Sequence, residues 1–169
     1  MNNEPLIRKS LIRLFTDISL TILFTALVFT FVFGICIQRG NDMYPSIKDG
    51  DVILYYRHPS LIQTEAVVYE SGGFLRTGRI AAVSGTVISE TNDHQITLNG
   101  IFLPEDPETG IYSKTFKAPD QELPATVSEG CYFILNDDRS RMSDSRSLGE
   151  IGRRQIKGRI ITVLRRRNI

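Results

Sequence analysis

The sequence of 169 residues has no tryptophan, two cysteines and two histidines, and these shortages limit what the protein can be. Cys36 lies in a long apolar run and Cys131 in a short one, so we expect no disulfide between them. His58 and His94 stand alone, without the spacing of metal ligands, and no glycine loop of the phosphate-binding kind is present. We therefore expect neither a bound metal nor a cofactor.

Charge is missing from one long stretch near the N-terminus. No charged residue occurs between Asp17 and Arg39, and residues 18–38 are rich in Leu, Ile, Val and Phe. A helix over this stretch would be roughly 31 Å long, close to the thickness of the hydrocarbon core of a bilayer. The sequence therefore predicts a transmembrane helix over residues 18–38, with a short segment 1–17 before it and a globular part 39–169 after it.

The apolar run does not fit a cleavable secretory signal, which has a shorter apolar region followed by small residues. Gly34-Ile35-Cys36 provides neither that cleavage site nor a lipoprotein site, so the run indicates an uncleaved signal anchor. Basic residues flank it about equally on both sides, and a long domain can be translocated regardless of them. We expect residues 1–17 in the cytoplasm and residues 39–169 outside the cell membrane.

The globular part has no excess of either charge. It holds 17 Lys and Arg and 17 Asp and Glu, because Arg8, Lys9, Arg13, Glu4 and Asp17 precede it. This balance argues against a nucleic-acid partner. The basic run 165–167 is typical of a solvated tail, and attraction to anionic lipid or wall polymer is the alternative.

Short apolar segments of strand length fill most of the globular part. They are rich in β-branched and aromatic residues, and turn sequences such as Asn99-Gly100 separate them. The predicted strands are 51–56, 65–70, 79–89, 94–103, 131–136 and 159–164. Residues 104–129 are acidic and aperiodic, which indicates a long surface excursion. The fold class is therefore mainly β: one N-terminal transmembrane helix followed by an all-β domain.

Three separated motifs carry a resemblance to a known family. They read GNDMYPSIKDGD at 40–51, GRIAAVSGT at 78–86 and NDDRSRMSDSRSLG at 136–149. In order and spacing they resemble the boxes of type I signal peptidases, which begin G-x-S-M-x-P, K-R-V-I-G and G-D-N-R. With the membrane anchor included, the resemblance covers roughly residues 18–163. It implies a fold of the peptidase S26 kind, with an extracytoplasmic β domain.

The chain departs from the family at the residues that carry its chemistry. The family cuts a peptide bond with a serine whose proton is taken by a lysine of lowered pKa. Asp42 stands at the serine position and Gly78 at the lysine position. Ser46 lies elsewhere in the turn, and Arg79 cannot act as a base because its guanidinium stays protonated. Met142 also replaces a serine of the third box, so serine-lysine catalysis is rejected.

The resemblance also implies roles for other residues. It implies a peptide-binding cleft that adds the peptide as a strand beside the protein's own edge strands. It further implies a supporting ion pair between Asp144 and Arg146 and a tight turn held by Asp137 and Arg139. The expected cleft residues are Asp42, Met43, Tyr44, Pro45 and Arg79, and the expected structural residues are Asp137, Arg139, Asp144, Ser145 and Arg146.

A second chemistry stays open, because two carboxylates that share a proton can activate water. Asp42 would need a partner, and Asp137, Asp138 and Asp144 are the candidates that the resemblance supplies. On this alternative the protein is an atypical signal peptidase that cleaves precursor proteins with Asp42 in place of the serine.

The pair of aspartate and glycine in place of serine and lysine also resembles signal-peptidase-like membrane proteins of streptococcal pilus gene clusters. That resemblance implies a non-proteolytic accessory protein of a Gram-positive cell, required when a sortase polymerises pilins. The expected partners are a pilin subunit, a class C sortase, or both, together with membrane lipid. A decayed paralogue without a role is the third possibility.

Overall fold

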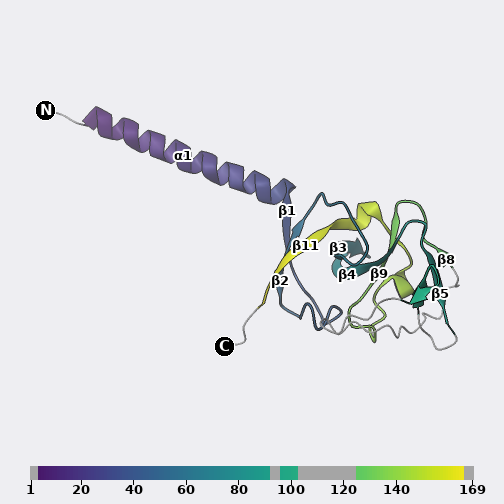
Figure 1. Cartoon of the computed structure of the whole chain (residues 1–169). Helices are drawn as coiled ribbons and strands as arrows, with labels where there is room; N and C mark the ends of the chain where they lie inside the picture. Colours follow the sequence, from purple (N-terminus) through teal and green to yellow (C-terminus); the bar gives the residue numbers. More distant parts are fainter. Residues whose placement is uncertain (1–3, 92–95, 103–124, 166–169) are drawn as a thin grey trace.

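The structure is a computed structural model that describes residues 4–91, 96–102 and 125–165, with side chains from Arg8 onward. It consists of one long helix and a β domain (Figure 1). This confirms the prediction of a mainly β protein with one N-terminal apolar helix. His94, most of the predicted excursion 104–129 and the last two arginines of the run 165–167 lie outside the described residues.

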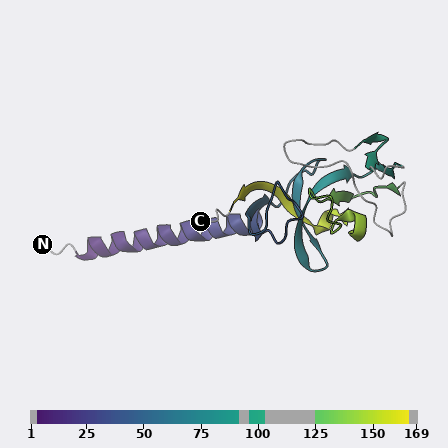
Figure 2. The ribbon, with the colours of Figure 1, turned by 90° about the horizontal axis from the view of Figure 1, so that it is seen from below.

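The helix α1 spans Glu4–Phe31 and projects away from the β domain in both views (Figure 1, Figure 2). Its segment Arg8–Phe31 is long and apolar enough to cross a bilayer, and no part of that segment is buried by the rest of the described protein. A core helix would be covered by other elements, so this helix has the character of a single-pass membrane anchor.

The helix ends earlier than the sequence predicts, at Phe31 instead of residue 38. The carbonyl oxygens at the end of the helix accept hydrogen bonds from residues that are distant in the sequence. Arg57 donates its backbone N–H to the Val32 oxygen at 2.9 Å and its Nε to the Phe33 oxygen at 2.7 Å. The ring Nε2 of His58 lies 3.0 Å from the Phe31 oxygen. Hydrophobicity alone could not reveal this end, because the partners lie more than twenty residues away.

The rest of the predicted apolar segment forms the strand β1, Phe33–Ile37. β1 pairs antiparallel with β2, Val52–Tyr56, so that Gly34 lies opposite Tyr55. A β-carbon at Gly34 would overlap the ring of Tyr55. The glycine therefore lets an aromatic ring cover the strand at the point where the membrane helix joins the sheet.

Seven antiparallel strands form the main sheet, in the order β1-β2-β11-β3-β4-β9-β10. A smaller sheet has the order β7-β6-β5-β8. The remaining strands are β3 (Ala66–Ser71), β4 (Phe74–Val83), β5 (Val87–Glu90), β6 (Ile96–Leu98), β7 (Ile101–Phe102), β8 (Ala125–Thr126), β9 (Cys131–Leu135), β10 (Ile151–Gly152) and β11 (Ile156–Leu164). A short helix α2, Ser145–Leu148, and a 3₁₀ turn, Arg153–Gln155, complete the described fold.

Two predicted strands are wrong as single elements. The predicted strand 79–89 is divided between β4 and β5 by a turn at Gly85, whose φ of 82° favours glycine. β4 also begins earlier, at Phe74. The predicted strand 94–103 is divided at Asn99-Gly100, where both residues have positive φ, as a two-residue hairpin turn requires.

Three buried clusters make up the core. One lies under the small sheet around Phe133, a second between β3, β4 and β9 around Tyr69, and a third around Met43 and Ile53. Met43 and Ile47 come from the first motif and are buried beside β2 and β3. This burial fixes the loop that follows β1 and so determines where Asp42 lies.

We predict that Gly34→Ala lowers the stability of the full chain in detergent micelles by about 1–3 kcal/mol, because the new methyl group collides with the Tyr55 ring. Gly152→Ala is the matched control, since a β-carbon there would lie 3.5 Å from its nearest neighbour, the Gln155 Oε1. Thermal unfolding measures both. Equal melting temperatures for the two variants would contradict the close packing of β1 on β2.

Candidate functional site

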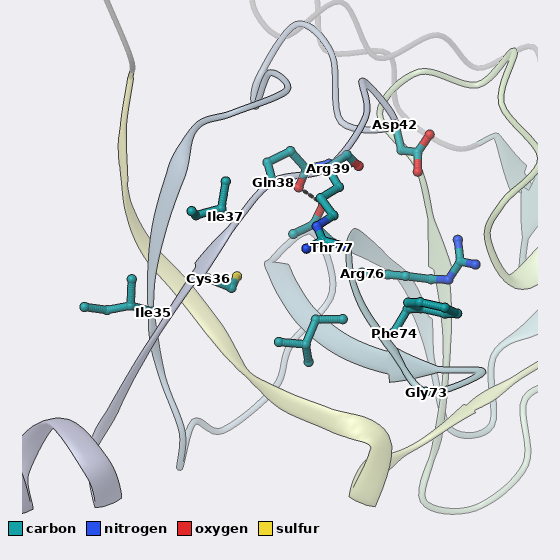
Figure 3. A pocket seen from close by; sticks show the side chains of 11 residues that line it. Ile35, Cys36, Ile37, Gln38, Arg39, Asp42, Gly73, Phe74, Arg76 and Thr77 are labelled. Atoms are coloured by element: carbon teal, nitrogen blue, oxygen red, sulfur yellow. Dashed lines mark hydrogen bonds between the residues drawn. The ribbon is translucent and has the colours of Figure 1, made fainter.

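The candidate site lies between two strand edges of the main sheet that have no partner strand among the described residues. β1 is the terminal strand of the sheet and pairs only with β2. β4 pairs with β3 along its whole first half, but β9 joins it only from Arg79 onward. The first half of β4, residues 74–78, therefore has one free edge. Both edges border the same gap (Figure 3).

The alternation of antiparallel hydrogen bonds identifies the main-chain groups on these edges. Gln38 exchanges backbone bonds with Asp51 and Gly50, on the β2 side. Alternate residues of a strand direct their main-chain groups to opposite sides, so the N–H and C=O groups of Ile35 and Ile37 lie on the free edge of β1. On β4, the backbone of Ile80 bonds towards Glu65 on the β3 side. The same alternation leaves Leu75 and Thr77 facing the gap.

The gap is a cleft of about 580 Å³. Its lining comes from β1, the loop after it and the β3–β4 hairpin: Ile35, Cys36, Ile37, Gln38, Arg39, Asp42, Gly73, Phe74, Leu75, Arg76 and Thr77. The Thr77 hydroxyl donates a 2.6 Å hydrogen bond to Gln38 Oε1, and both side chains are buried. Figure 3 shows this bond joining the two walls. The cleft is thus a groove between two strand edges, and a buried hydrogen bond joins its two walls.

Asp42 lies at one end of this cleft, just after β1 (Figure 3). Its carbonyl oxygen accepts a hydrogen bond from the backbone N–H of Asp138 at 2.9 Å. Its carboxylate Oδ1 lies 3.7 Å from Nη1 of Arg141, and Nε of the same arginine lies 3.2 Å from Asp138 Oδ2. The first and third motifs therefore meet here, and the negative charge of Asp42 faces a guanidinium.

The third motif is held by a buried ion pair between Asp144 and Arg146. Arg146 Nη2 lies 2.7 Å from Asp144 Oδ2, and both side chains have no exposed surface. The Asp144 carboxylate also accepts the backbone N–H of Asn136 at 2.9 Å, and Arg146 donates to the carbonyl oxygens of Arg139 and Arg141. The pair thereby closes the loop between β9 and α2 and holds Arg141 beside the cleft.

Ser145 adds one further support to this loop. Its Oγ accepts the backbone N–H of Ile134 at 2.9 Å, which ties the start of α2 to β9.

Asp137 binds Arg79 and not Arg139, which corrects the pairing implied by the resemblance. Arg79 donates from Nε and Nη2 to the two carboxylate oxygens of Asp137, at 2.9 and 2.8 Å. Arg79 lies on β4, and Asp137 follows the end of β9. The two strands are neighbours in the sheet, so their pairing brings the two side chains together.

Arg139 is buried, and its Nε and Nη1 have no hydrogen-bond partner among the described residues. Burial, and then the neighbouring charge of Arg146, lower the pKa of Arg139 to about 10. The side chain still carries its charge at neutral pH, so it is a structural cation and no candidate for a base.

The space beside Gly78 is filled by other side chains. A β-carbon at Gly78 would overlap the Cγ2 methyl group of Ile134 and would lie 3.2 Å from Cε1 of Tyr69. The Tyr69 side chain is fully buried, and its hydroxyl has no hydrogen-bond partner in the described part of the chain. Burial, and then the charge of Asp144, raise the pKa of this hydroxyl, so it stays protonated. A lysine would find no room at this position.

Of the five expected cleft residues, the structure places only Asp42 on the cleft wall. Met43 is buried in the core because its side chain points to β2 and β3. Tyr44 is half exposed under the ammonium group of Lys48, 5.5 Å from the ring centre, and the bond to Pro45 is cis. Arg79 points to Asp137.

Sequence reasoning missed most of the lining, including Gln38, Arg76 and Thr77. One of these residues, Arg76, could have been noticed from its position. Arg76 lies two residues before Gly78, and alternation in a strand puts both on one face. Gln38 was assigned to the membrane helix, and only the pairing of β1 shows otherwise.

The carboxylates near Asp42 are each held by an arginine, which leaves little basis for a proton-sharing pair. Asp137 is bound by Arg79 and Asp144 by Arg146, while Arg141 contacts both Asp42 and Asp138. Carboxylates share a proton when no cation neutralises them. Within the described residues, no group of three or more His, Cys, Asp and Glu side chains has the arrangement of metal ligands.

These motifs, the anchor and the sheet agree with what comparison of the whole chain shows. The family described as signal peptidase, peptidase S26, matches residues 11–164, and the chain belongs to this family.

Individual relatives are distant. The chain is 24% identical over 163 residues to a protein named inactive signal peptidase IA of Staphylococcus aureus (strain Mu50 / ATCC 700699), covering 90% of each chain. It is 25% identical over 162 residues to signal peptidase I S of Bacillus subtilis (strain 168), covering 89% of this chain and 87% of that protein. A protein named inactive and one named simply signal peptidase are thus about equally similar to this chain, so overall similarity does not discriminate between the two.

Among solved structures, a signal peptidase I from Enterococcus faecalis V583 matches with a TM-score of 0.47 and 24% identity. The match covers 62% of this chain and 98% of that one.

We predict that Asp42→Ser combined with Gly78→Lys cleaves no precursor protein. The lysine side chain collides with Ile134 and Tyr69, so the variant also unfolds at a lower temperature. Asp42→Ser alone is the control and keeps the melting temperature of the wild type. Precursor cleavage by the double variant, measured on gels with a purified secretory precursor, would show that the space beside Gly78 can open.

The Cys36 thiol in the cleft gives a second prediction. Burial raises its pKa to about 11, well above its ordinary value. In a Cys131→Ser background, iodoacetamide should modify Cys36 about 100-fold more slowly at pH 8 than it modifies an exposed thiol. The rate should rise about tenfold per pH unit up to pH 10, because the thiolate is the reactive form. A rate that levels off below pH 9 would contradict the burial of Cys36.

Proposed function

We propose that this protein is a non-proteolytic, membrane-anchored accessory factor required for sortase-mediated polymerisation of pilins, and that it binds a pilin or the sortase through its cleft. The single observation that carries the proposal is the state of the cleft. Among the described residues its strand edges have no partner strand, while Asp42 and Gly78 stand where the family has its catalytic serine and lysine.

The open edges support binding of an extended segment. Main-chain groups of Ile35 and Ile37 on one wall, and of Leu75 and Thr77 on the other, are free to pair with an added strand. Strand addition supplies affinity through main-chain hydrogen bonds and needs no catalytic residue. A pilin tail or a sortase segment is therefore a suitable occupant of this cleft.

The residues at the former catalytic centre support the absence of proteolysis. Asp42 faces Arg141, and a carboxylate would disfavour an oxyanion that develops beside it. Gly78 has no side chain, and Ile134 and Tyr69 fill the space that a lysine would need. Arg79 stays protonated and is bound to Asp137.

The anchor supports work at a membrane surface. Only Val32 separates α1 from β1, so one wall of the cleft is continuous with the apolar helix. On this proposal the N-terminus is cytoplasmic and the β domain lies on the outer side of the cell membrane, where sortases and pilins meet.

The proposal predicts the pattern of pilin polymers in cells that lack the chromosomal copy. Deletion should abolish the pilin ladder, whereas wild type and Asp42→Ala should restore it, and signal peptides should be trimmed in all strains. Accumulation of uncut precursor in the deletion and in Asp42→Ala would instead support a peptidase that uses Asp42.

A variant of the edge strand tests the cleft itself. Ile35→Pro removes one N–H from the free edge of β1, and Ile35→Ala keeps that N–H while it shortens the side chain. We expect Ile35→Pro to reduce the polymer at least about tenfold and Ile35→Ala to reduce it little, with both variants present at wild-type level. Normal ladders with Ile35→Pro would refute binding by strand addition.

A further inference from the structure

We propose that the cleft selects an extended peptide segment with an acidic side chain, and that this carboxylate binds the guanidinium of Arg76 on the cleft wall. The inference rests on the proposed peptide-binding function and specifies the chemistry of the occupant. The residue concerned, Arg76, lies on β4 two residues before Gly78, the position of the family's lysine.

Arg76 is a cation on the cleft wall, and the described residues give it no carboxylate partner. Its Nε is buried and has no hydrogen-bond partner within residues that the structure describes, and no ion pair there joins it to a carboxylate. Two nearby arginines are paired, Arg79 with Asp137 and Arg146 with Asp144, and Arg139, which also lacks partners for Nε and Nη1 among the described residues, does not line the cleft. A partly buried guanidinium that lacks an acceptor is suited to receive one from a ligand.

Tyr69 is the buried neighbour of Arg76 and lies beneath the cleft wall. The two residues are directly opposite in the ladder between β3 and β4, so their side chains share one face of the sheet. The Tyr69 hydroxyl is buried without a hydrogen-bond partner, and the charges of both Arg76 and Asp42 act on it. Figure 3 shows the Arg76 guanidinium extending towards the end of the cleft where Asp42 lies.

The charge balance of the cleft favours an acidic occupant. Its lining includes two guanidinium groups, Arg39 and Arg76, and one carboxylate, Asp42. Asp42 already has the Arg141 guanidinium at 3.7 Å. A ligand carboxylate beside Arg76 would therefore compensate an unbalanced positive charge, whereas a lysine there would add to it.

Strand geometry favours an acidic side chain over a chain terminus. A strand that pairs with the free edge of β4 places one of its residues directly opposite Arg76, as Tyr69 is on the other side. The side chains of all three residues then lie in one row on the same face. A glutamate in that place can reach the guanidinium while its main chain continues through the cleft.

The test uses the full chain in detergent micelles and fluorescent, N-acetylated, C-amidated ten-residue peptides of Thr, Ser and Val. One series carries a single glutamate moved through the central positions, and a matched series carries glutamine. We expect at least one glutamate peptide to bind about tenfold more tightly than its glutamine counterpart, measured by fluorescence anisotropy. The preference should shrink between 0.05 and 0.5 M NaCl.

Variants assign the preference to Arg76. Arg76→Gln should lower the affinity for the glutamate peptide about tenfold, to that for the glutamine peptide, and so remove the preference. Arg154→Gln, an exposed arginine that does not line the cleft, is the control and should change nothing. Arg76→Glu should reverse the preference towards a lysine peptide. Melting temperatures check that each variant is folded.

The outcomes separate this inference from the proposed function. If wild type binds glutamate and glutamine peptides equally, or if Arg76→Gln weakens both equally, the acidic preference is refuted and the peptide-binding cleft stands. A glutamine peptide with a free C-terminal carboxylate is a further control. If it binds as tightly as the glutamate peptide, recognition of an acidic side chain is refuted. If no peptide binds at all, the proposed function fails and the inference falls with it.

Discussion

The buried ion pair between Asp144 and Arg146 is the interaction on which the arrangement of the cleft depends. It is fully buried and connects to the main chain at Asn136, Arg139 and Arg141, so it closes the whole loop between β9 and α2. Removal of one partner from such a pair leaves an uncompensated buried charge, which costs about 3–5 kcal/mol. Because this loop carries Arg141 and the N–H that binds the carbonyl of Asp42, the first motif is held through the third.

Other side chains occupy the positions of the family's catalytic serine and lysine and make their own contacts there. Asp42 faces Arg141, Arg79 binds Asp137, and the space next to Gly78 contains Ile134 and Tyr69. A lysine at position 78 would need Ile134 and Tyr69 to move before it could work with a serine at position 42. The strand edges on either side of the cleft have no such restriction. Strand edges that can pair with an extended segment and side chains that can cleave it are separate features, and the described residues keep the edges without the serine and lysine.

The charges of the cleft give this binding surface a chemistry of its own. Signal peptidases act on peptides through a hydroxyl and an amine, whereas this cleft presents Arg39, Arg76 and a carboxylate that has its own cation. Among the described residues, the buried Nε of Arg76 on the cleft wall has no acceptor, and a ligand carboxylate would supply one. Such a site discriminates by charge and by hydrogen bonding more than by the size of a side chain.

The sequence alone determined the apolar anchor, the mainly β class, the family and the loss of serine and lysine, because each of these depends on residues at fixed spacing along the chain. Tertiary structure decided the rest. Residues 33–37 read as part of a membrane helix, yet they form a strand because β2 and the Arg57 side chain bind them from a distance. Arg76 became a cleft residue because β9 leaves the first half of β4 unpaired. Asp137 pairs with Arg79 because the adjacent strands β4 and β9 bring the two side chains together. Which edge is free and which charge finds a partner depends on contacts between segments far apart in the chain, and no local pattern records them.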